Sequence, residues 1–594
     1  MSSAVIVCFV FIVEMSKQTK QNETLPVSKT KLLSLAAVIV LVIGGVWFFF
    51  QQKEHQADDG FKPDQFNRHA VVSNGPECAA IGMKILKEYN GTAVDAAIAT
   101  LFCEGVTVCQ SMGLGGGFVA TIYHKDSGTV DTLLARERAP FASTVNMYQN
   151  MTEIKGILAA AVPGELKGYA DLHNKYGRVP WNVLIQPTID LCRTGHIVTE
   201  YLERVLVLMR DRIFSSPSLR EVFVNPATGD VWKTGDRIKR LKLAKTLEII
   251  AEEGADTMYT KNGTIANLLV DEIKELGGII TIDDFVDYKT EWAKPVSTKL
   301  RGNYTIHSTP LPASGMILSF MLNVLSGFEP SFTVKFIHQM IESFKYGYAK
   351  RTHLGDLNYD ETFISSFSDM ETANKVREQI LPDKTFGDYK HYGADFSMEA
   401  DHGTAHISVL AANGDAISIT STINAIFGSR VLSKSTGIIL NDEMDDFSSP
   451  GKENGFGLRP SPANYIAPRK RPLSSMCPVI VLDKNNDAIL IAGSAGGSKI
   501  TTTVAYVFAK HLWLGESLED SINAKRIHHQ LLPMEVVFEK GYNPEILEGL
   551  RQIGHNISED KPVIGFTAVT AISRANGYVE AMVDPRRYGS IQIN

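Results

Sequence analysis

The sequence predicts an α+β fold in which layers of β-sheet are covered by helices, preceded by a single transmembrane helix. Three observations carry this prediction. After about residue 400 the chain alternates antiparallel hairpins with helices, before that point it is rich in helices with short strands, and a 19-residue stretch near the N-terminus has no charged residue. Hairpins interleaved with helices are typical of sheets that bury a face against a helical layer.

The uncharged stretch, Leu32 to Phe50, reads LLSLAAVIVLVIGGVWFFF. A helix of this length spans about 28 Å, close to the roughly 30 Å core of a bilayer. A buried core helix is the alternative, but such helices rarely run so long without a polar face. We expect residues 1–31 to be cytoplasmic, 32–50 to be a signal-anchor helix and 51–68 to be a polar stalk. The part of the chain after the stalk would then be extracellular, in a single-pass type II protein of the plasma membrane.

Composition narrows the classes of partner. The chain has 594 residues, 44% hydrophobic and 21% charged, which is the composition of a globular protein. Its net charge is −7 with basic residues interspersed, so nucleic acid is a poor candidate partner. Six cysteines without a CxxC or Cys/His cluster predict neither a disulfide scaffold nor a zinc site. We expect no metal and no cofactor.

The first half of the chain is predicted to be mainly helical. Asn90-Gly91 is a typical helix end, and a new apolar pattern begins directly after it. The expected helices are Ala79–Tyr89, Ala93–Glu104, Gly164–Tyr176, Tyr201–Ile213, Arg240–Glu253 and Ile265–Glu275.

The second half is predicted to be built of hairpins. His406–Ala412 and Asp415–Ser421 flank Asn413-Gly414, a pair preferred in type I′ turns because both central residues need positive φ. Further hairpins are expected at Val479–Leu482 with Ala488–Ala492 and at Phe566–Arg574 with Tyr578–Val583, with a helix at Lys499–Trp513.

A Gly-Thr pair, Gly403-Thr404, stands where the first of these strands begins. If the bond between the two residues is cut, Thr404 carries a hydroxyl nucleophile and an α-amine base on one residue. A free α-amine has a pKa of roughly 7.7–8.0, against about 10.4 for lysine, so part of it is uncharged at neutral pH. A loop residue without a catalytic role is the alternative for an isolated Gly-Thr pair.

The pair belongs to an ordered set of motifs. In sequence order they are AVDAAIA at 93–99, SMGLGGG at 111–117, ARE at 135–137, AVPGE at 161–165, DHGTAHIS at 401–408, STIN at 421–424, NDEMDDFSSP at 441–450, PLSSMCP at 472–478 and GSAGG at 493–497. From about residue 70 to its end, the chain resembles the γ-glutamyltransferase (glutathione hydrolase) family of N-terminal nucleophile hydrolases.

The resemblance implies a four-layer αββα sandwich and maturation by self-cleavage. A large subunit, residues 69–403, would end at Gly403, and a small subunit, residues 404–594, would begin at Thr404 and stay paired with it as a heterodimer. Thr404 would attack a γ-glutamyl amide, and Thr422 would contact the nucleophile. A plain β-branched strand residue is the alternative for Thr422.

The resemblance also implies how a zwitterionic γ-glutamyl group would be bound. Arg136 offers a planar fork for the α-carboxylate, and Ser474 and Ser475 add donors. Backbone N–H groups of Gly496 and Gly497 would face the developing oxyanion, although a glycine pair can also be a plain strand-to-helix turn. The α-ammonium would be held by Asn424, Glu443 and Asp446. Without the resemblance, residues 443–446 would be interpreted as a solvated acidic loop or a weak calcium loop.

Two kinds of covalent feature are expected of an extracellular domain. Cys78 and Cys103 match the disulfide positions of the family, with two buried thiols as the alternative. Sequons downstream of the apolar stretch place candidate N-glycosylation sites at Asn90, Asn150, Asn262, Asn303 and Asn556.

The leading hypothesis is therefore a membrane-anchored enzyme that cleaves the γ-glutamyl bond of glutathione and its S-conjugates and passes the glutamyl group to water, an amino acid or a peptide. One alternative is acylase-type amide hydrolysis on the same fold. The other is an uncleaved, inactive cell-surface interaction domain.

Overall fold

The computed structural model describes residues 67–149, 151, 154–356, 361–397, 403–451, 458–560, 566–575 and 577–594. The predicted cytoplasmic segment 1–31, the predicted membrane helix 32–50, nearly all of the stalk and Asn150 lie outside these residues. No helix of the described part is long and apolar enough to cross a bilayer. The membrane helix therefore stays a prediction.

Two antiparallel sheets form the centre of the fold. The seven-stranded sheet has the order β20-β1-β11-β12-β2-β3-β8, with β1 Ala70–Ser73, β2 Gly117–His124, β3 Thr129–Ala135, β8 Glu291–Ala293, β11 Ala405–Leu410, β12 Ala416–Thr422 and β20 Ser590–Ile593. The six-stranded sheet has the order β19-β18-β14-β13-β10-β9, with β9 Val296–Leu300, β10 Tyr304–Ser308, β13 Val479–Leu482, β14 Ala488–Ala495, β18 Ala568–Ser573 and β19 Glu580–Val583.

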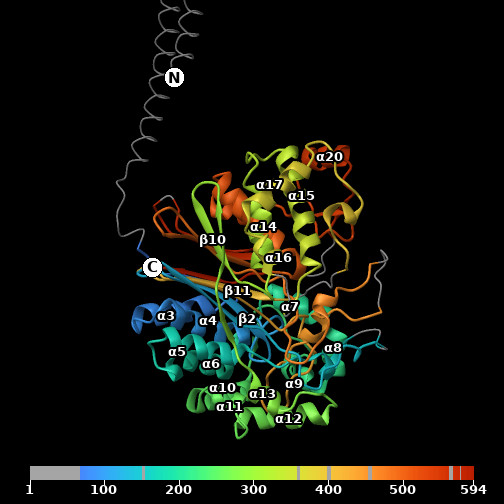
Figure 1. The fold of residues 1–594 in the computed structure, drawn as a ribbon. Coiled ribbons are helices and arrows are strands. Elements are labelled where there is room, and N and C mark those ends of the chain that lie inside the picture. Colours follow the sequence, from blue (N-terminus) through green and yellow to red (C-terminus); the bar gives the residue numbers. More distant parts are fainter. Residues whose placement is uncertain are drawn as a thin grey trace, which may run out of the picture. The chain divides into compact units, whose positions relative to one another are not determined.

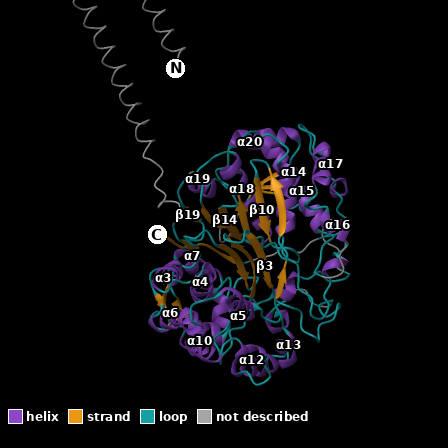
Figure 2. Cartoon of the chain, turned by 60° about the vertical axis from the view of Figure 1, so that its left-hand side comes forward, coloured by secondary structure: helices purple, strands orange, loops and turns teal. Residues whose placement is uncertain are grey.

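The two sheets pack face to face (Figure 2). Side chains from both inner faces make one apolar cluster, which includes Val72, Tyr123, Ile480, Ile491 and Ile572. Stacking buries the inner face of each sheet, and the outer faces are covered by helices, so little alternation of polar and apolar residues remains along the central strands.

Helices cover the outer face of each sheet, as Figure 1 shows. Against the seven-stranded sheet pack α3 Cys78–Glu88, α4 Ala93–Thr107 and α5 Glu165–Tyr176. Behind them, α6 Trp181–Thr194 packs on α4, and α10 Leu241–Glu253 packs on α6. Against the six-stranded sheet pack α14 Gly315–Leu325 and α18 Ile500–Phe508. Behind them, α15 Val334–Arg351 and α17 Met370–Gln379 pack on α14, and α20 Pro544–Ile553 packs on α15. The predicted α+β fold with four αββα layers is confirmed.

The remaining elements are peripheral to these layers. They are α7 Glu200–Leu208, α8 Arg210–Ser215, α9 Pro217–Phe223, α11 Asp256–Tyr259, α12 Thr264–Glu275, α13 Ile282–Asp287, α16 Glu361–Ser365, α19 Leu518–Asn523, β4 His196–Ile197, β5 Val224–Asn225, β6 Asp230–Val231, β7 Arg237–Ile238, β15 Ile527–His528, β16 Val536–Phe538 and β17 Ile557–Glu559. Short 3₁₀ turns occupy Gly156–Ala159, Tyr389–Tyr392, Glu443–Asp446, Pro462–Asn464 and Gly497–Lys499.

Helix α4 shows how the sequence sets an element boundary. Thr92 caps it: its hydroxyl accepts from Asp95 N at 3.0 Å, and the Asp95 carboxylate accepts from Thr92 N at 2.9 Å. Such a reciprocal capping box fixes the first turn. A disulfide between Cys78 and Cys103, with 5.4 Å between the Cα atoms, ties α3 to α4.

Several predicted elements differ from the structure. The helix predicted at Tyr201–Ile213 is broken at Met209 into α7 and α8. The helix predicted at Lys499–Trp513 becomes α18 and a π-helical turn at Ala509–Trp513. The predicted type I′ turn is wrong, because Gly414 has φ +93° whereas Asn413 is not among the residues with positive φ. Gly414 N donates to Ala411 O, which makes a longer loop of the type I kind with one left-handed glycine.

Candidate active site

Four neighbouring strands of the seven-stranded sheet, β11, β12, β2 and β3, have one terminus each along the same side of the sheet, and several predicted site residues lie next to these strand ends. We call this side the site edge. The last registered pair of β11 and β12 is Ala405 with Ser421, so Thr404 and Thr422 come next on the two strands. Thr422 in turn pairs with Gly117 of β2, whose other neighbour, β3, ends immediately before Arg136. The antiparallel order alone therefore places Thr404, Thr422 and Arg136 along the site edge.

Thr404 and Gly403 have unusual backbones in this continuous chain. Gly403 has φ +68° and Thr404 has φ +88°, a region that β-branched residues almost never adopt. A Cβ on Gly403 would lie 1.7 Å from Asn424 O, so no other residue fits there. Thr404 is 3% exposed, and its carbonyl accepts a hydrogen bond from Arg587 Nη1 at 3.0 Å. The peptide unit between Gly403 and Thr404 is thus buried and held in a strained conformation.

Thr422 and Asn424 form a tight turn after β12. Thr422 Oγ1 accepts from Asn424 N at 2.9 Å, and Asn424 Nδ2 donates to Asp442 O at 3.3 Å. Asp442 also accepts from Ala425 N through its carboxylate at 2.8 Å. These bonds join the end of β12 to the acidic 3₁₀ turn Glu443–Asp446.

Arg136 is buried and connects that acidic turn to the segment before Ser474. Its Nη1 lies 2.7 Å from Glu443 Oε2 and its Nη2 lies 2.6 Å from Asp446 Oδ2. Nε and Nη2 also donate to the carbonyls of Pro472 and Leu473 at 3.3 and 3.2 Å. The predicted carboxylate-binding and ammonium-binding side chains therefore lie in direct contact, paired with one another.

A further carboxyl, Glu137, belongs to this cluster and was not among the predicted site residues. Its Oε2 lies 3.6 Å from Arg136 Nη1, and burial raises the pKa of Glu137 to about 7. Burial also raises the pKa of Glu443 well above its usual value, although the Arg136 charge opposes this, and raises that of Asp442 to about 8. Three carboxyls, those of Glu137, Glu443 and Asp446, face one guanidinium, so the cluster has an excess of acid that a cationic ligand group would neutralise. Its place beside Arg136 in the ARE motif at 135–137 is the sequence signal that could have identified Glu137.

The serines and glycines of the predicted site lie on the six-stranded side. Ser474 N donates to Pro312 O at 2.9 Å, and the Ser474 carbonyl accepts from Ser314 Oγ at 2.6 Å. Gly496 and Gly497 have φ +145° and +64° and lead from β14 into the 3₁₀ turn before α18. Thr501 Oγ1, in the first turn of α18, donates to Ser475 O at 3.3 Å, which brings the two segments together.

The described residues contain one group that has the composition of a metal site. Ligand atoms of His338, Glu342 and His555 lie within 4.8 Å of one another. Lys345 Nζ, however, lies 3.0 Å from Glu342 Oε1, and Tyr392 OH donates to Glu342 Oε2 at 2.8 Å. A metal would have to displace that ammonium, so the geometry favours a hydrogen-bonded network over a metal centre.

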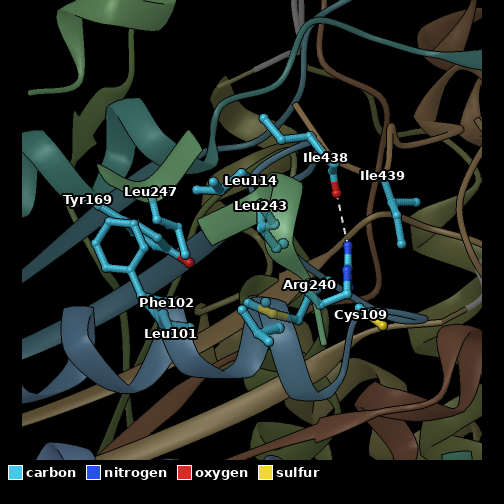
Figure 3. Close-up of a pocket in the computed structure, with 15 residues that line it drawn as sticks. Leu101, Phe102, Cys109, Leu114, Tyr169, Arg240, Leu243, Leu247, Ile438 and Ile439 are labelled. Atoms are coloured by element: carbon cyan, nitrogen blue, oxygen red, sulfur yellow. Dashed lines mark hydrogen bonds between the residues drawn. The ribbon is translucent and has the colours of Figure 1, made fainter. Parts of the chain in front are cut away.

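A small cavity of about 20 Å³ lies between α4, α5 and α10 (Figure 3). Leu101, Phe102, Tyr169 and Leu243 give it an apolar wall, and Arg240 Nη2 donates to Gly437 O at 2.9 Å beside it. Its volume suits a water molecule and is far too small for a peptide-sized substrate.

The described asparagines of the predicted sequons, Asn90, Asn262, Asn303 and Asn556, are all exposed. Glycosylation at these positions stays a prediction.

A sequence model of the family described as Gamma-glutamyltranspeptidase matches residues 78–593. The chain belongs to the gamma-glutamyltranspeptidase family. It is therefore an enzyme, and membership of the gamma-glutamyltranspeptidases gives it γ-glutamyl transferase or hydrolase activity.

Relatives match this gamma-glutamyltranspeptidase along nearly its whole length. Scoloptoxin SSD14 of Scolopendra dehaani is 40% identical over 581 residues, which cover 95% of this chain and 99% of that protein. Glutathione hydrolase proenzyme 2 of Schizosaccharomyces pombe is 36% identical over 548 residues, 89% of this chain and 88% of that protein. A crystal structure of cephalosporin acylase from Bacillus halodurans has a TM-score of 0.77 at 22% identity, covering 88% of this chain and 95% of that one. That likeness concerns the fold alone.

Proposed function

We propose that this gamma-glutamyltranspeptidase cleaves itself between Gly403 and Thr404 and then uses Thr404 to cleave the γ-glutamyl bond of glutathione and its S-conjugates. The observation that carries the proposal is the position of Thr404 on the same site edge as the Arg136–Glu443–Asp446 cluster. A γ-glutamyl group carries an α-carboxylate and an α-ammonium, so its selective binding needs an anion-binding and a cation-binding group next to the nucleophile.

The strained peptide unit favours self-cleavage. Thr404 Oγ1 attacks the carbonyl carbon of Gly403, the C–N bond breaks, and the proton of the hydroxyl passes to the leaving nitrogen. Water then hydrolyses the resulting ester and leaves a carboxylate on Gly403 and a free α-amine on Thr404. Residues in such sparsely populated conformations cost about 1–3 kcal/mol each, and cleavage releases that cost.

The same hydroxyl then acts on the substrate. The α-amine of Thr404 accepts the hydroxyl proton as Oγ1 attacks the γ-carbonyl, and it returns a proton to the leaving amine, which leaves a γ-glutamyl ester on Thr404. Water, an amino acid or a dipeptide takes the glutamyl group in the second half-reaction. N–H groups of Gly496 and Gly497 are proposed as oxyanion donors, and loss of one such donor costs about 3–4 kcal/mol of transition-state stabilisation. Thr422 is proposed to orient the nucleophile.

Substrate binding is proposed to exchange ion pairs. The α-carboxylate of the glutamyl group would pair with the guanidinium of Arg136 and accept hydrogen bonds from Ser474 and Ser475. The α-ammonium would pair with the carboxylates of Glu443 and Asp446 and donate a hydrogen bond to Asn424. Because a zwitterion brings one charge of each sign, the exchange leaves the buried cluster no worse compensated than before, which a ligand with only one charge would not do.

The decisive experiment compares wild type with Thr404→Ala and Thr404→Ser. Wild type should run as two fragments on a denaturing gel, and the smaller should begin with Thr404 by N-terminal sequencing. Thr404→Ala should stay one chain and release no 4-nitroaniline from its γ-glutamyl amide, whereas Thr404→Ser should retain slow processing and some turnover. Turnover by Thr404→Ala, or an active preparation whose small fragment starts elsewhere, would reject the mechanism.

We propose further that the enzyme is anchored in the plasma membrane by residues 32–50, with its catalytic part outside the cell. The uncharged 19-residue stretch and the exposed sequon asparagines support this. In intact cells the enzyme should be degraded by added protease, and glycosidase treatment should increase its gel mobility. Protection from protease without prior permeabilisation would contradict the orientation.

A further inference from the structure

The carbonyl of Thr404 is held by a residue that none of the motifs includes. Arg587 lies in the segment between β19 and β20 and is 7% exposed. Its Nη1 donates to Thr404 O at 3.0 Å, and its guanidinium lies over the ring of Tyr201, 5.4 Å from the centroid. No carboxylate of the described residues forms an ion pair with it. A guanidinium cannot lose its proton in proteins, so a full positive charge is buried beside the nucleophile.

A small cavity of about 10 Å³ lies at the same place, lined by Thr404 and Arg587 among others. Three buried polar atoms of its lining residues have no hydrogen-bond partner among the described residues: Asn74 Nδ2, Gln110 Oε1 and Arg587 Nε. Buried polar atoms without partners are uncommon in native proteins and call for a function. Their residues line the same cavity as Thr404, which would gain a new polar group, its α-amine, when the chain is cut.

We propose that Arg587 is a positioning residue for Thr404. The Arg587 guanidinium fixes the carbonyl of Thr404, and its positive charge favours the uncharged, proton-accepting form of the released α-amine. Gln110 Oε1 offers the new amine an acceptor in the same cavity. This inference rests on the proposed role of Thr404.

The size of the charge effect follows from covalent geometry. The nitrogen and carbonyl oxygen of one residue lie about 3 Å apart, so the α-amine comes within about 6–7 Å of Arg587 Nη1. At an effective dielectric constant of about 20, a unit charge at that distance shifts the titration of the amine by about one to two pH units. A nearby cation disfavours the ammonium, so the shift is downward.

The other titratable groups around Thr404 oppose this effect weakly near neutral pH. Burial raises the pKa of Glu104 on α4 to about 7, that of Asp442 to about 8 and that of Glu165 on α5 well above its usual value. Burial lowers the pKa of His406 on β11 to about 3, so its ring is neutral. Arg136 is already paired with Glu443 and Asp446. Arg587 is the charged side chain among the described residues that line the cavity.

The test uses the full chain with Arg587→Met, which removes the charge, and Arg587→Lys, which keeps it. Arg204→Met is the matched control, because Arg204 lies over the same Tyr201 ring at 5.8 Å but its Nη2 donates to Arg586 O at 3.4 Å, whereas Arg587 Nη1 donates to Thr404 O. For each variant, N-terminal sequencing first establishes whether Thr404 has been released. The pH dependence of kcat/KM is then measured with γ-glutamyl-4-nitroanilide, and the titration of the Thr404 amine is followed by the pH dependence of its labelling with 1-fluoro-2,4-dinitrobenzene.

In Arg587→Met the acid limb of kcat/KM and the labelling curve should both move up by about one pH unit, while Arg587→Lys and Arg204→Met stay near wild type. An unshifted acid limb in a processed Arg587→Met would overturn the inference and leave the proposed function standing. If Arg587→Met is not processed, the wild-type labelling curve decides: a midpoint below the ordinary 7.7–8.0 supports the inference and a midpoint at or above it refutes it. Absence of a free Thr404 amine in active wild type rejects the proposed function itself.

Discussion

Replacing Arg136 by methionine tests the central cluster of the site most directly. The methionine keeps most of the volume of the side chain but removes the charge that faces Glu443 Oε2 at 2.7 Å and Asp446 Oδ2 at 2.6 Å. Both carboxylates are buried, so the variant leaves them without their cation.

Two effects of different size follow from this change. Removing one partner of a buried ion pair costs about 3–5 kcal/mol of folding stability, because the remaining charge stays buried and uncompensated. The carboxyls reduce that cost by taking up protons, since without Arg136 the pKa values of Glu137 and Glu443 rise further above their usual range. The loss of stability should therefore be largest at alkaline pH and smaller near pH 5.

Activity should fall through substrate binding. A hydrogen bond to a charged group contributes about 1.5–3 kcal/mol, which corresponds to roughly a 10- to 150-fold higher KM for the γ-glutamyl donor. Because Arg136 is proposed to hold the α-carboxylate in ground state and transition state alike, kcat should change much less than KM. Arg136→Lys should recover only part of the loss, since an ammonium lacks the planar fork.

The assays are processing on a denaturing gel, the midpoint of urea unfolding and steady-state kinetics with γ-glutamyl-4-nitroanilide. Arg574→Met is the matched control: Arg574 is also buried and faces Asp487 at 3.3 Å, but it follows Ser573 at the opposite end of the sheets. The control should lose stability with an unchanged KM. A processed Arg136→Met enzyme with normal KM and reduced kcat would refute the assignment of Arg136 to the carboxylate.

Three further predictions concern maturation and stability. Gly403→Ala should fold but stay uncleaved on a gel, because its Cβ would lie 1.7 Å from Asn424 O and its φ is +68°; normal processing would show that the strained unit is dispensable. Replacing Cys78 and Cys103 by alanine removes a cross-link between residues 25 positions apart and should lower the free energy of unfolding by about 3.5 kcal/mol. Activity should be retained at urea concentrations below the unfolding transition, and an unchanged urea midpoint would contradict the prediction. Burial raises the pKa of Glu104 from 4.5 to about 7, so the stability that this carboxyl contributes is present below pH 4.5 and is lost as the pH rises through 7. Glu104→Gln should remove this pH-dependent part of the free energy of unfolding, about 3 kcal/mol. A variant whose stability keeps the wild-type pH profile would reject the prediction.

The sequence predicted the hairpins of the second half well because their turns are polar and their strands short. It did not predict β2 and β3, although these strands are central. Both sheets are covered on their outer faces and packed on their inner ones, and β2 is buried along seven of its eight residues. A strand buried on both faces lacks the period-2 alternation by which strands are recognised. The long helices α14 and α15 were missed for a similar reason, since nearly all their residues are buried.

The site was predicted in its parts but not in its resting arrangement. The motifs supplied Arg136, Glu443 and Asp446 as two separate binding groups, each waiting for a ligand charge. Buried charges need partners whether or not a ligand is present, so in the structure these groups pair with each other. Spacing cannot reveal such a pairing, because it joins residues about 310 positions apart. The same limit applies to Arg587, which reaches Thr404 from a segment without any recognisable motif.

The strand order also constrains when the proposed cleavage takes place. In the seven-stranded sheet, β1 of the proposed large subunit lies between β20 and β11 of the proposed small subunit, and β12 of the small one pairs with β2 of the large one. In the other sheet β10 pairs with β13. Separating the proposed subunits would break four strand pairings, β1–β11, β1–β20, β2–β12 and β10–β13, all between segments distant in sequence. If the chain were cut before folding, two separate fragments would have to associate in solution to form these interleaved sheets. A strained bond that is attacked only in the folded sheet avoids that problem, because the strain at Thr404 exists only once β11 and β12 have paired and Gly403 is pressed against Asn424. On this reasoning the proposed cleavage would follow folding, and the strand pairings would hold the two subunits together after it.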